Sequence, residues 1–442
     1  MKQGHLSEYF EGVGVKTLSA VDANPARSNQ HEIGTTAAMR RFLGEGKQTF
    51  PTIYLWLGGE QESISAEGIA THYDTREKQP HRSPEWRLYY DSNPVTGSMK
   101  TGDTLFLAKR PNGTLMFIVT PPESTIRSQL LWLFGFSIQP QLRFAVNEIS
   151  GDDDAELDFA ARRILDELGI EYEDPNANTL DEIIARFGTT FPSTAEFSQL
   201  ARLTLPHVEA RDDPDGALLA WLNQEEAMFR RLEQRVMAER LAEGFEKDGS
   251  PDVDGFVSFS LSVQNRRKSR MGLALENHLE AVFRSLKLQF EAQAPTENGN
   301  TVDFLFPGSL QYHADEWDAD NLIMLAAKAT CKDRWRQVLA EAAKIRRKHL
   351  ITLEPAISPT QTAQMRAADL QLVIPRRLQE SYNPEQRTWI WSLSDFVAFV
   401  RESEVRWNRG RNWLPLVDFL RSLELGSLDL SRDADFGRDI EL

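Results

Sequence analysis

The sequence has little cysteine, since Cys331 is the only one among 442 residues. A single cysteine excludes an internal disulfide framework and a cysteine-rich zinc site, and it suits a reducing compartment. Because a small thiol in an apolar strand usually serves packing, we interpret Cys331 as a core residue rather than a nucleophile.

Long apolar runs are missing as well. No uninterrupted stretch of about 18 apolar residues occurs, and the N-terminus lacks a basic region followed by an apolar one. We therefore predict a cytoplasmic protein without membrane association. With 442 residues, of which 41% are hydrophobic, the chain is expected to form two domains or more.

The sequence also lacks the basic excess that is common in DNA-binding proteins, because its net charge is −16. Residues 1–150 hold 15 acidic and 15 basic residues, residues 151–254 hold 26 and 10, and residues 255–442 hold 25 and 25. The whole excess lies in the middle segment, so the flanking regions have room for basic faces. The global charge does not exclude a nucleic-acid partner.

Residues 50 to about 148 have the pattern of a β domain. Short apolar runs at 52–57, 68–70, 86–90, 104–107 and 114–119 are separated by turn residues such as Asn93-Pro94 and Gly102-Asp103. Strands at this spacing predict a barrel-like β domain.

The pattern becomes helical near Gly151, with apolar residues at helical spacing over 157–168 and 218–241. Between these stretches, residues 171–178 are polar and include Pro175, which predicts a linker. Residues 247–252 form a second polar break.

After residue 255 the predicted order is helix, strand, strand, helix, strand, strand, helix. The strands are expected at 302–306, 322–328, 349–353 and 370–374, with an amphipathic helix over 275–286 and another over 334–348. This order predicts a small sheet flanked by helices, an α/β arrangement.

Asp303 and Lys328 stand on two successive predicted strands. Hydrolysis of a phosphodiester requires a metal ion held by carboxylates, and a lysine beside it adds a fixed positive charge that orients the attacking water. An acid on one strand and a lysine on the next is the arrangement of the PD-(D/E)xK nucleases. The pair alone is a weak indication, because charged residues at strand ends are common in α/β domains.

The residues around Lys328 are more specific. The runs at 328–337 and 265–270, with Glu341, closely resemble the EcoRII-type restriction endonucleases, and the likeness extends through 300–308, 312–313 and 349–353. It covers most of residues 255–380. The resemblance implies a catalytic site in which Asp303 is a metal ligand, Lys328 the catalytic lysine, and Glu341 a second carboxylate supplied by a helix, with Mg²⁺ as cofactor.

Two positions depart from the general motif. Val302 replaces the usual proline, and Ala326 stands where the second acid, two residues before the lysine, is expected. Metal binding then requires Glu341 to replace that acid, as in the branch of the family that cuts sites of CC/GG type. Glu276 is a lesser candidate for a third carboxylate, with a solvated helix residue as the equally acceptable interpretation.

The resemblance also implies residues that read DNA. Guanine is read by Arg or Lys and cytosine by an acid in the major groove, and Lys332, Asp333 and Arg334 supply both kinds of group. They resemble the family's reader of adjacent C:G pairs, and the alternative interpretation, an N-terminal helix turn with Asp333 as its cap, is compatible with this role. The neighbouring basic cluster is expected to contact phosphates or bases rather than form only a solvated charge run; it comprises Arg266, Arg267, Lys268 and Arg270.

Residues 15–34 resemble the start of the effector domain of the same family, a DNA-binding β pseudobarrel that grips a second copy of the site. Two recognition arms are expected, with surface loop residues as the alternative interpretation. The first arm contains Asn24, Arg27, Asn29 and Gln30, and the second contains Arg76, Lys78, Arg82 and Arg87.

The predicted fold is therefore an α/β restriction-endonuclease-like catalytic domain, with a mixed sheet flanked by helices, plus an N-terminal mainly-β DNA-binding pseudobarrel domain. We place the effector domain at 1–172, a linker at 173–179 and the catalytic domain at 180–442. Within the last, 180–254 is a helical lead-in, 255–380 the nuclease core and 381–442 C-terminal helices.

The predicted function is that of a type II, IIE-like endonuclease, Mg²⁺-dependent and homodimeric, that cuts double-stranded DNA at a short palindrome such as CCNGG or CCWGG. The N-terminal domain would bind effector DNA and restrain cleavage, so deletion of residues 1–172 is expected to raise cleavage of single-site DNA. A protecting methyltransferase is expected in the host, not as a bound subunit.

Two alternatives remain open. A catalytically inactive, sequence-specific DNA-binding regulator on the same fold is disfavoured because acid, lysine and base-reading residues are all present. A nuclease for RNA or structured DNA would not require the reader at 332–334. The central bases of the site, and whether they are flipped, are not given by the sequence.

Overall fold

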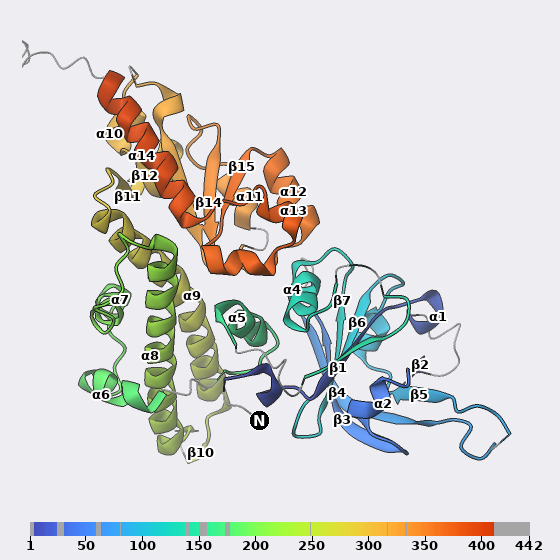
Figure 1. The fold of residues 1–442 in the computed structure, drawn as a ribbon. Helices are drawn as coiled ribbons and strands as arrows, with labels where there is room; N and C mark the ends of the chain where they lie inside the picture. The colour runs from blue at the N-terminus through green and yellow to red at the C-terminus, as the bar shows by residue number, and fades with distance from the viewer. Residues whose placement is uncertain are drawn as a thin grey trace, which may run out of the picture.

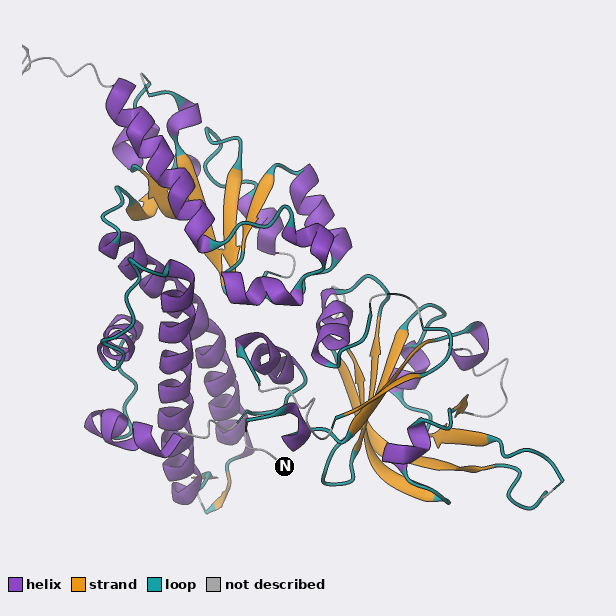
Figure 2. Cartoon of the chain, viewed as in Figure 1, coloured by secondary structure: helices purple, strands orange, loops and turns teal. Residues whose placement is uncertain are grey.

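The computed structural model of the chain describes residues 4–23, 31–58, 63–79, 81–137, 139, 141–149, 157–172, 177–247, 249–315, 317–331 and 334–410. Figure 1 traces the chain, and Figure 2 shows its longer strands gathered in two separate sheets, one near each end of the described sequence. Among these residues no helix is long and apolar enough to cross a membrane.

The first sheet is mainly antiparallel, and its strand order is β2-β5-β4-β3-β7-β6-β1-β8, with β3 and β7 parallel. Its strands are β1 (Gly12–Thr17), β2 (Glu32–Gly34), β3 (Gln48–Trp56), β4 (Ile64–Asp74), β5 (Trp86–Tyr90), β6 (Thr104–Lys109), β7 (Leu115–Thr120) and β8 (Ala145–Glu148). Short helices lie between them: α1 (Ala20–Ala23), α2 (Met39–Leu43), α3 (Pro94–Ser98) and α4 (Thr125–Leu133). The predicted mainly-β N-terminal fold is confirmed.

The central strands of this sheet are apolar because both of their faces are covered. Alternate residues of a strand point to opposite faces. Leu105 and Leu107 of β6 enter one core, whereas Phe106 and Ala108 enter a second core together with Leu130 of α4. Strand β4, nearer the edge, is largely exposed or half-buried over its first half.

A helical segment follows. It contains α5 (Phe159–Glu167), α6 (Asp181–Ile184), α7 (Thr194–Leu203), α8 (Pro214–Glu243) and α9 (Val253–Ser285), with the hairpin β9 (Glu246–Lys247) and β10 (Ser250–Pro251) between the last two. Both long helices begin at an aspartate cap, in which Asp213 accepts from the Gly216 amide at 3.0 Å and Asp252 from the Gly255 amide at 2.9 Å. The predicted polar break at 247–252 is this hairpin with the cap of α9.

The second sheet has the order β11-β12-β13-β14-β15, antiparallel across its first three strands and parallel across its last three. Its strands are β11 (Glu291–Pro295), β12 (Thr301–Phe306), β13 (Ile323–Lys328), β14 (Lys348–Thr352) and β15 (Leu370–Val373). The accompanying helices are α10 (Ser309–His313), α11 (Trp335–Val338), α12 (Pro359–Ala367), α13 (Pro384–Arg387) and α14 (Leu393–Gly410). The predicted α/β arrangement, a mixed sheet flanked by helices, is confirmed.

Two predictions about this sheet were wrong. The helix expected over 334–348 is only the single turn of α11, because Ala342 adopts a left-handed φ of 47° and Lys348 begins β14. The apolar residues that have helical spacing there lie instead in a loop that packs on the sheet. Strand β11 was not predicted at all, because the only apolar side chains that alternate in its sequence Glu-Ala-Gln-Ala-Pro are alanines, and it has no β-branched or aromatic residue.

Helix α5 belongs to both halves of the molecule. Ala161, Ile164 and Leu165 pack in the N-terminal core, whereas Phe159 and Ala160 join the core of the second sheet. The predicted linker at 173–179 follows this helix. Residues 173–176 lie outside the described residues, and 177–180 form a short 3-10 helix. A cut after residue 172 would therefore remove side chains from the C-terminal core.

The two halves also meet through α4, which faces α12 in Figure 1. Thr125 Oγ1 donates to Gln361 Oε1 at 2.9 Å, and Gln129 Nε2 donates to Glu354 Oε1 at 2.9 Å. Glu354 is buried, and its other oxygen accepts from the Cys331 amide at 3.0 Å. An N-terminal helix is thereby connected to the segment that follows Lys328.

Phe283 of α9 is the aromatic centre of the C-terminal core, and its ring lies 5.2 to 5.6 Å from the rings of Phe290, Phe304 and Phe306. We predict that Phe283→Ala lowers the free energy of unfolding by about 3–5 kcal/mol, because a large cavity replaces a fully buried ring. Urea denaturation measures the change. Leu273→Ala, at an exposed position of the same helix, is the control and should cost well under about 1 kcal/mol; equal losses would contradict this account of the core.

Candidate active site

Asp303 and Lys328 meet on one face of the second sheet. Phe304 pairs with Leu325 in the antiparallel ladder, so one step further along Asp303 lies opposite Ala326. Lys328, two residues after Ala326, projects from the same face. The Lys328 Nζ lies 2.7 Å from Asp303 Oδ2, which also accepts from the Ala327 amide at 2.7 Å. The sequence-predicted pair is thus brought together.

Ala326 explains why a further acid must come from elsewhere. Its methyl group occupies the strand position that faces Asp303, and it is fully buried. A carboxylate supplied from outside β13 is therefore required if two acids are to hold one ion.

Glu341 is one such carboxylate, although it comes from the loop after α11 and not from a helix as predicted. Burial raises its pKa, Lys328 and Lys348 act to lower it, and Asp303 raises it. Glu341 therefore lies within electrostatic range of the pair. Its Oε2 is buried without a hydrogen-bond partner.

The loop that carries Glu341 is held by a buried lysine. Lys348 Nζ donates to the carbonyls of Ala342 at 3.2 Å and Ile345 at 2.7 Å. Glu297 accepts from the Ala343 amide and from the Tyr312 hydroxyl. This framework fixes the backbone on both sides of Glu341.

Glu276 of α9 lies on the other side of Asp303. Its Oε2 accepts from Gln293 Nε2 at 2.9 Å, and the same nitrogen lies 3.4 Å from Asp303 Oδ1. Burial raises the pKa of Glu276, the charge of Asp303 raises it further, and Lys328 and Gln293 act to lower it. Glu276 is half-buried, and both interpretations of it, as a third carboxylate of the site and as a solvated helix residue, stay predictions.

The residues present fit a divalent cation. The donors are carboxylate oxygens, which Mg²⁺ prefers, and a bound cation would oppose the burial and the Asp303 charge that raise the pKa of Glu276 and of Glu341. The unpartnered Glu341 Oε2 points to the same need. As the described residues stand, no three His, Cys, Asp or Glu side chains are close enough to form a ready metal cluster, and the Lys328 ammonium is the counter-charge of Asp303.

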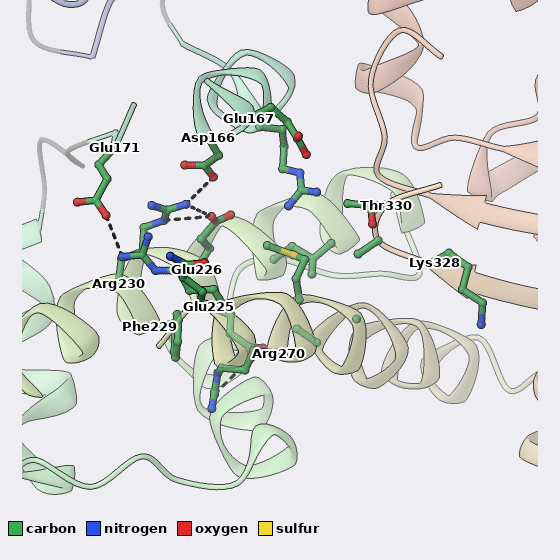
Figure 3. A pocket seen from close by; sticks show the side chains of 18 of the residues that line it. Asp166, Glu167, Glu171, Glu225, Glu226, Phe229, Arg230, Arg270, Lys328 and Thr330 are labelled. Atoms are coloured by element: carbon green, nitrogen blue, oxygen red, sulfur yellow. Dashed lines mark hydrogen bonds and ion pairs between the residues drawn. The ribbon is translucent and has the colours of Figure 1, made fainter. Parts of the chain in front are cut away.

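A cavity of about 820 Å³ opens beside the pair, between α5, α8, α9 and the segment after β13 (Figure 3). Lys328, Glu276 and Arg334 are among its lining residues. Arg334 is exposed, as a base-reading residue must be. Lys332 and Asp333, including the alternative of Asp333 as a helix cap, lie outside the described residues.

The basic cluster of α9 is more engaged than predicted. Arg266 lies over the Phe191 ring at 4.1 Å, and Arg267 forms ion pairs with Glu233 and Glu171. The side chain of Lys268 lies outside the described residues.

Arg270 is more buried than predicted. It is 7% exposed and lies 4.4 Å from the Phe197 ring and 4.9 Å from the Phe229 ring. It packs inside the helical segment and also lines the cavity with Lys328, so its contact with DNA stays a prediction.

The second predicted effector arm is formed by the loop between β4 and β5. Arg76 pairs with Glu85 at 2.6 Å, Arg82 donates to Gln79, and Lys78 is exposed. Arg87, within β5, is held by Glu32 and Glu85. The first arm, with Asn24, Arg27, Asn29 and Gln30, lies outside the described residues.

The comparisons with known proteins address the C-terminal part. Residues 229–397 match the family model described as "EcoRII C terminal". Type II restriction enzyme EcoRII of Escherichia coli is 42% identical over 209 residues, which cover 47% of this chain and 50% of that enzyme. Residues 229–397 are thus similar to the C-terminal part of EcoRII. The resemblance inferred from the residues around Lys328 is confirmed.

The chain has further relatives. Type II restriction enzyme SsoII of Shigella sonnei is 23% identical over 159 residues, which cover 34% of this chain and 51% of SsoII. The chain thus spans about half the length of the curated relatives it matches.

Two solved structures are similar in part. Metal-depleted Ecl18kI in complex with uncleaved, modified DNA has a TM-score of 0.43 at 20% identity, covering 52% of this chain and 84% of that one. The PspGI–substrate DNA complex has a TM-score of 0.40 at 15% identity, covering 48% and 93%.

Three residues of the C-terminal part escaped sequence reasoning. Gln293 sits in the strand that was not predicted, Lys348 was assigned to a helix, and Glu354 follows a strand without any local motif. For Lys348 and Glu354, the only indication in the sequence was a charged residue inside or beside a strongly apolar run.

Asp303 and Lys328 should have separable effects on ion binding and cleavage. We predict that Asp303→Asn abolishes binding of Mn²⁺, whereas Lys328→Ala retains or strengthens it, because the lysine is a competing cation at 2.7 Å from the carboxylate. Cleavage should fall by about 100-fold or more in both variants. Calorimetric titration with Mn²⁺ and a DNA cleavage assay provide the two readouts. Loss of Mn²⁺ binding in Lys328→Ala would contradict the assignment.

Proposed function

We propose that the protein is a Mg²⁺-dependent type II restriction endonuclease that hydrolyses double-stranded DNA at a short palindrome of CC/GG type. The observation that carries the proposal is the Lys328–Asp303 pair, with Glu341 and Glu276 beside it, inside a region that is similar to the C-terminal part of EcoRII. The similarity to the family accounts for the fold around the pair. The pair itself supplies the acid and the lysine that phosphodiester hydrolysis requires.

Asp303 and Glu341 would hold the ion, with Glu276 as a lesser ligand. A divalent ion held there supplies Lewis acidity and favours ionisation of a bound water. Lys328 would orient the attacking water and stabilise charge on the phosphate oxygens in the transition state. Both side chains are largely buried, with 22% of the Lys328 side chain and 11% of the Asp303 side chain exposed, which strengthens their interaction relative to water.

Base reading is assigned to Lys332, Asp333 and Arg334, with Arg266 and Arg267 as further DNA contacts. Arg334 supports this, because its exposed side chain lines the same cavity as Lys328. A palindromic site cut on both strands requires two active sites related by a two-fold axis, so we propose a homodimer.

Digestion of a sequenced plasmid that carries several CC/GG-type sites tests the proposal. With Mg²⁺, the wild-type protein should give discrete fragments that all end at one short palindrome, and Lys328→Ala should give none. Binding without cleavage would instead indicate the DNA-binding regulator. Ragged degradation would indicate a nuclease without sequence specificity.

We further propose that the N-terminal region binds effector DNA and restrains cleavage. One support is that acidic residues of α5 and the following segment already occupy basic residues beside the cavity (Figure 3): Asp166 pairs with Arg230 at 2.5 Å, and Glu171 with Arg267 at 2.9 Å. A phosphate backbone would have to displace these carboxylates.

A second support is the contact of Gln129 with Glu354. Because Glu354 also accepts from the Cys331 amide, movement of α4 bears directly on the segment between Lys328 and Arg334. Since a deletion of residues 1–172 would also remove Phe159 from the C-terminal core, point variants in the full chain test the restraint more directly.

Gln129→Glu would place a second carboxylate against Glu354. The two charges repel, so docking of α4 should weaken and cleavage of single-site DNA should rise about fivefold or more. Burial raises the pKa of Glu354. At low pH its neutral form would share a proton with the introduced carboxylate, so the increase should be largest at high pH and shrink on acidification.

The control is the swapped pair, Gln129→Glu with Glu354→Gln, which restores an amide opposite a carboxylate and should return cleavage to the wild-type rate. Gln141→Glu, elsewhere in the N-terminal region, controls for added charge. The restraint through α4 is refuted if Gln129→Glu cleaves single-site DNA at the wild-type rate at every pH.

A further inference from the structure

Gln293 has a backbone conformation that its side chain does not favour. It sits in the middle of β11 with φ of 49°, in the left-handed region that suits glycine. Its neighbours Ala292 and Ala294 pair regularly with Phe304 and Val302 of β12. Such strain persists where the surroundings impose it, and it is commonly found at functional sites.

The strained conformation directs the amide of Gln293 to two carboxylates. Nε2 lies 2.9 Å from Glu276 Oε2 and 3.4 Å from Asp303 Oδ1. The opposite oxygen of Asp303 is held by the Lys328 ammonium and the Ala327 amide. Asp303 is therefore fixed through both oxygens, and Glu276 is connected to it across α9 and β12.

A neutral donor is the group that this position requires. Two carboxylates that face one site repel each other, and an amide with two N–H groups can join them without adding a charge. A lysine there would compete with a bound cation, and a glutamate would add a third negative charge. Packing gives no reason for a glutamine at position 293, because the residue is exposed.

We propose that Gln293 is a positioning residue that holds Glu276 and Asp303 in the arrangement that receives the divalent ion. This inference rests on the proposed function of the site. The residue comes from a strand that carries no recognisable nuclease motif. The inference also explains why Gln293 keeps an unfavourable left-handed backbone, since that conformation serves ion binding.

Gln293→Gly separates this role from a structural one. Glycine relieves the left-handed backbone and removes the amide, so the protein should melt no lower than the wild type while its affinity for Mn²⁺ falls about 10- to 100-fold. Gln293→Asn, which tolerates the backbone but is one methylene shorter, should show the same loss. Titration calorimetry with Mn²⁺ on the intact protein and thermal unfolding, both without DNA, provide the readouts.

The matched control is Lys287→Gly. Lys287 also has a left-handed φ, of 56°, but it follows the end of α9 and its side chain is exposed. This variant should gain the same backbone relief and keep its affinity for Mn²⁺.

Unchanged Mn²⁺ affinity in Gln293→Gly would overturn the inference, as would a loss of affinity that is matched by a lower melting temperature. If the wild-type protein itself binds no Mn²⁺, the proposed ion site fails and the inference fails with it. The first two results leave the proposed function standing, so the two failures are distinguishable.

Discussion

The ion pair between Lys328 and Asp303 joins two neighbouring strands of the C-terminal sheet and forms the centre of the proposed site. Asp303 lies where β12 and β13 cease to pair, and its Oδ2 accepts a backbone amide as well as the ammonium. Without the lysine, Asp303 would lose its positive counter-charge, and its carboxylate would still interact unfavourably with those of Glu276 and Glu341. Burial raises the pKa of Glu276 and of Glu341, and repulsion by Asp303 raises both further. An oxygen-binding cation resolves the same repulsion, which connects folding to the proposed chemistry.

The same electrostatic reasoning explains the arrangement of the rest of the molecule. The acidic excess of the sequence lies in residues 151–254, and part of it pairs with Arg230 and Arg267 close to the cavity. The chain thus supplies internal acidic partners for basic groups that, in the proposed function, contact DNA. Helix α5, shared between both cores, keeps these partners in place. In the proposed function, acidic side chains of the chain and the DNA backbone compete for the same basic residues, Arg230 and Arg267.

Much of this could be predicted from the sequence. The apolar runs of β3, β6 and β7 and the strands that carry Asp303 and Lys328 follow from local patterns, because each is buried on at least one face over its whole length. The family resemblance added Glu341, which no local motif identifies.

The rest depends on tertiary contacts. The 334–348 segment has helical spacing, yet Lys348 binds its carbonyls and draws it into a loop. Strand β11 forms by pairing with the edge of β12, and the orientation of Gln293 follows from that pairing. Arg270 was expected at the surface because a basic cluster usually is, and its burial between two phenylalanine rings follows from how α7 and α8 pack on α9.

The central claim is that the carboxylates around Asp303 form an ion site for phosphodiester hydrolysis. Anomalous diffraction from crystals of the intact protein soaked in Mn²⁺ tests it most directly. The account predicts a single strong peak in contact with Asp303 and Glu341, within reach of Glu276. A peak bound elsewhere, or none at a saturating concentration of Mn²⁺, would contradict it.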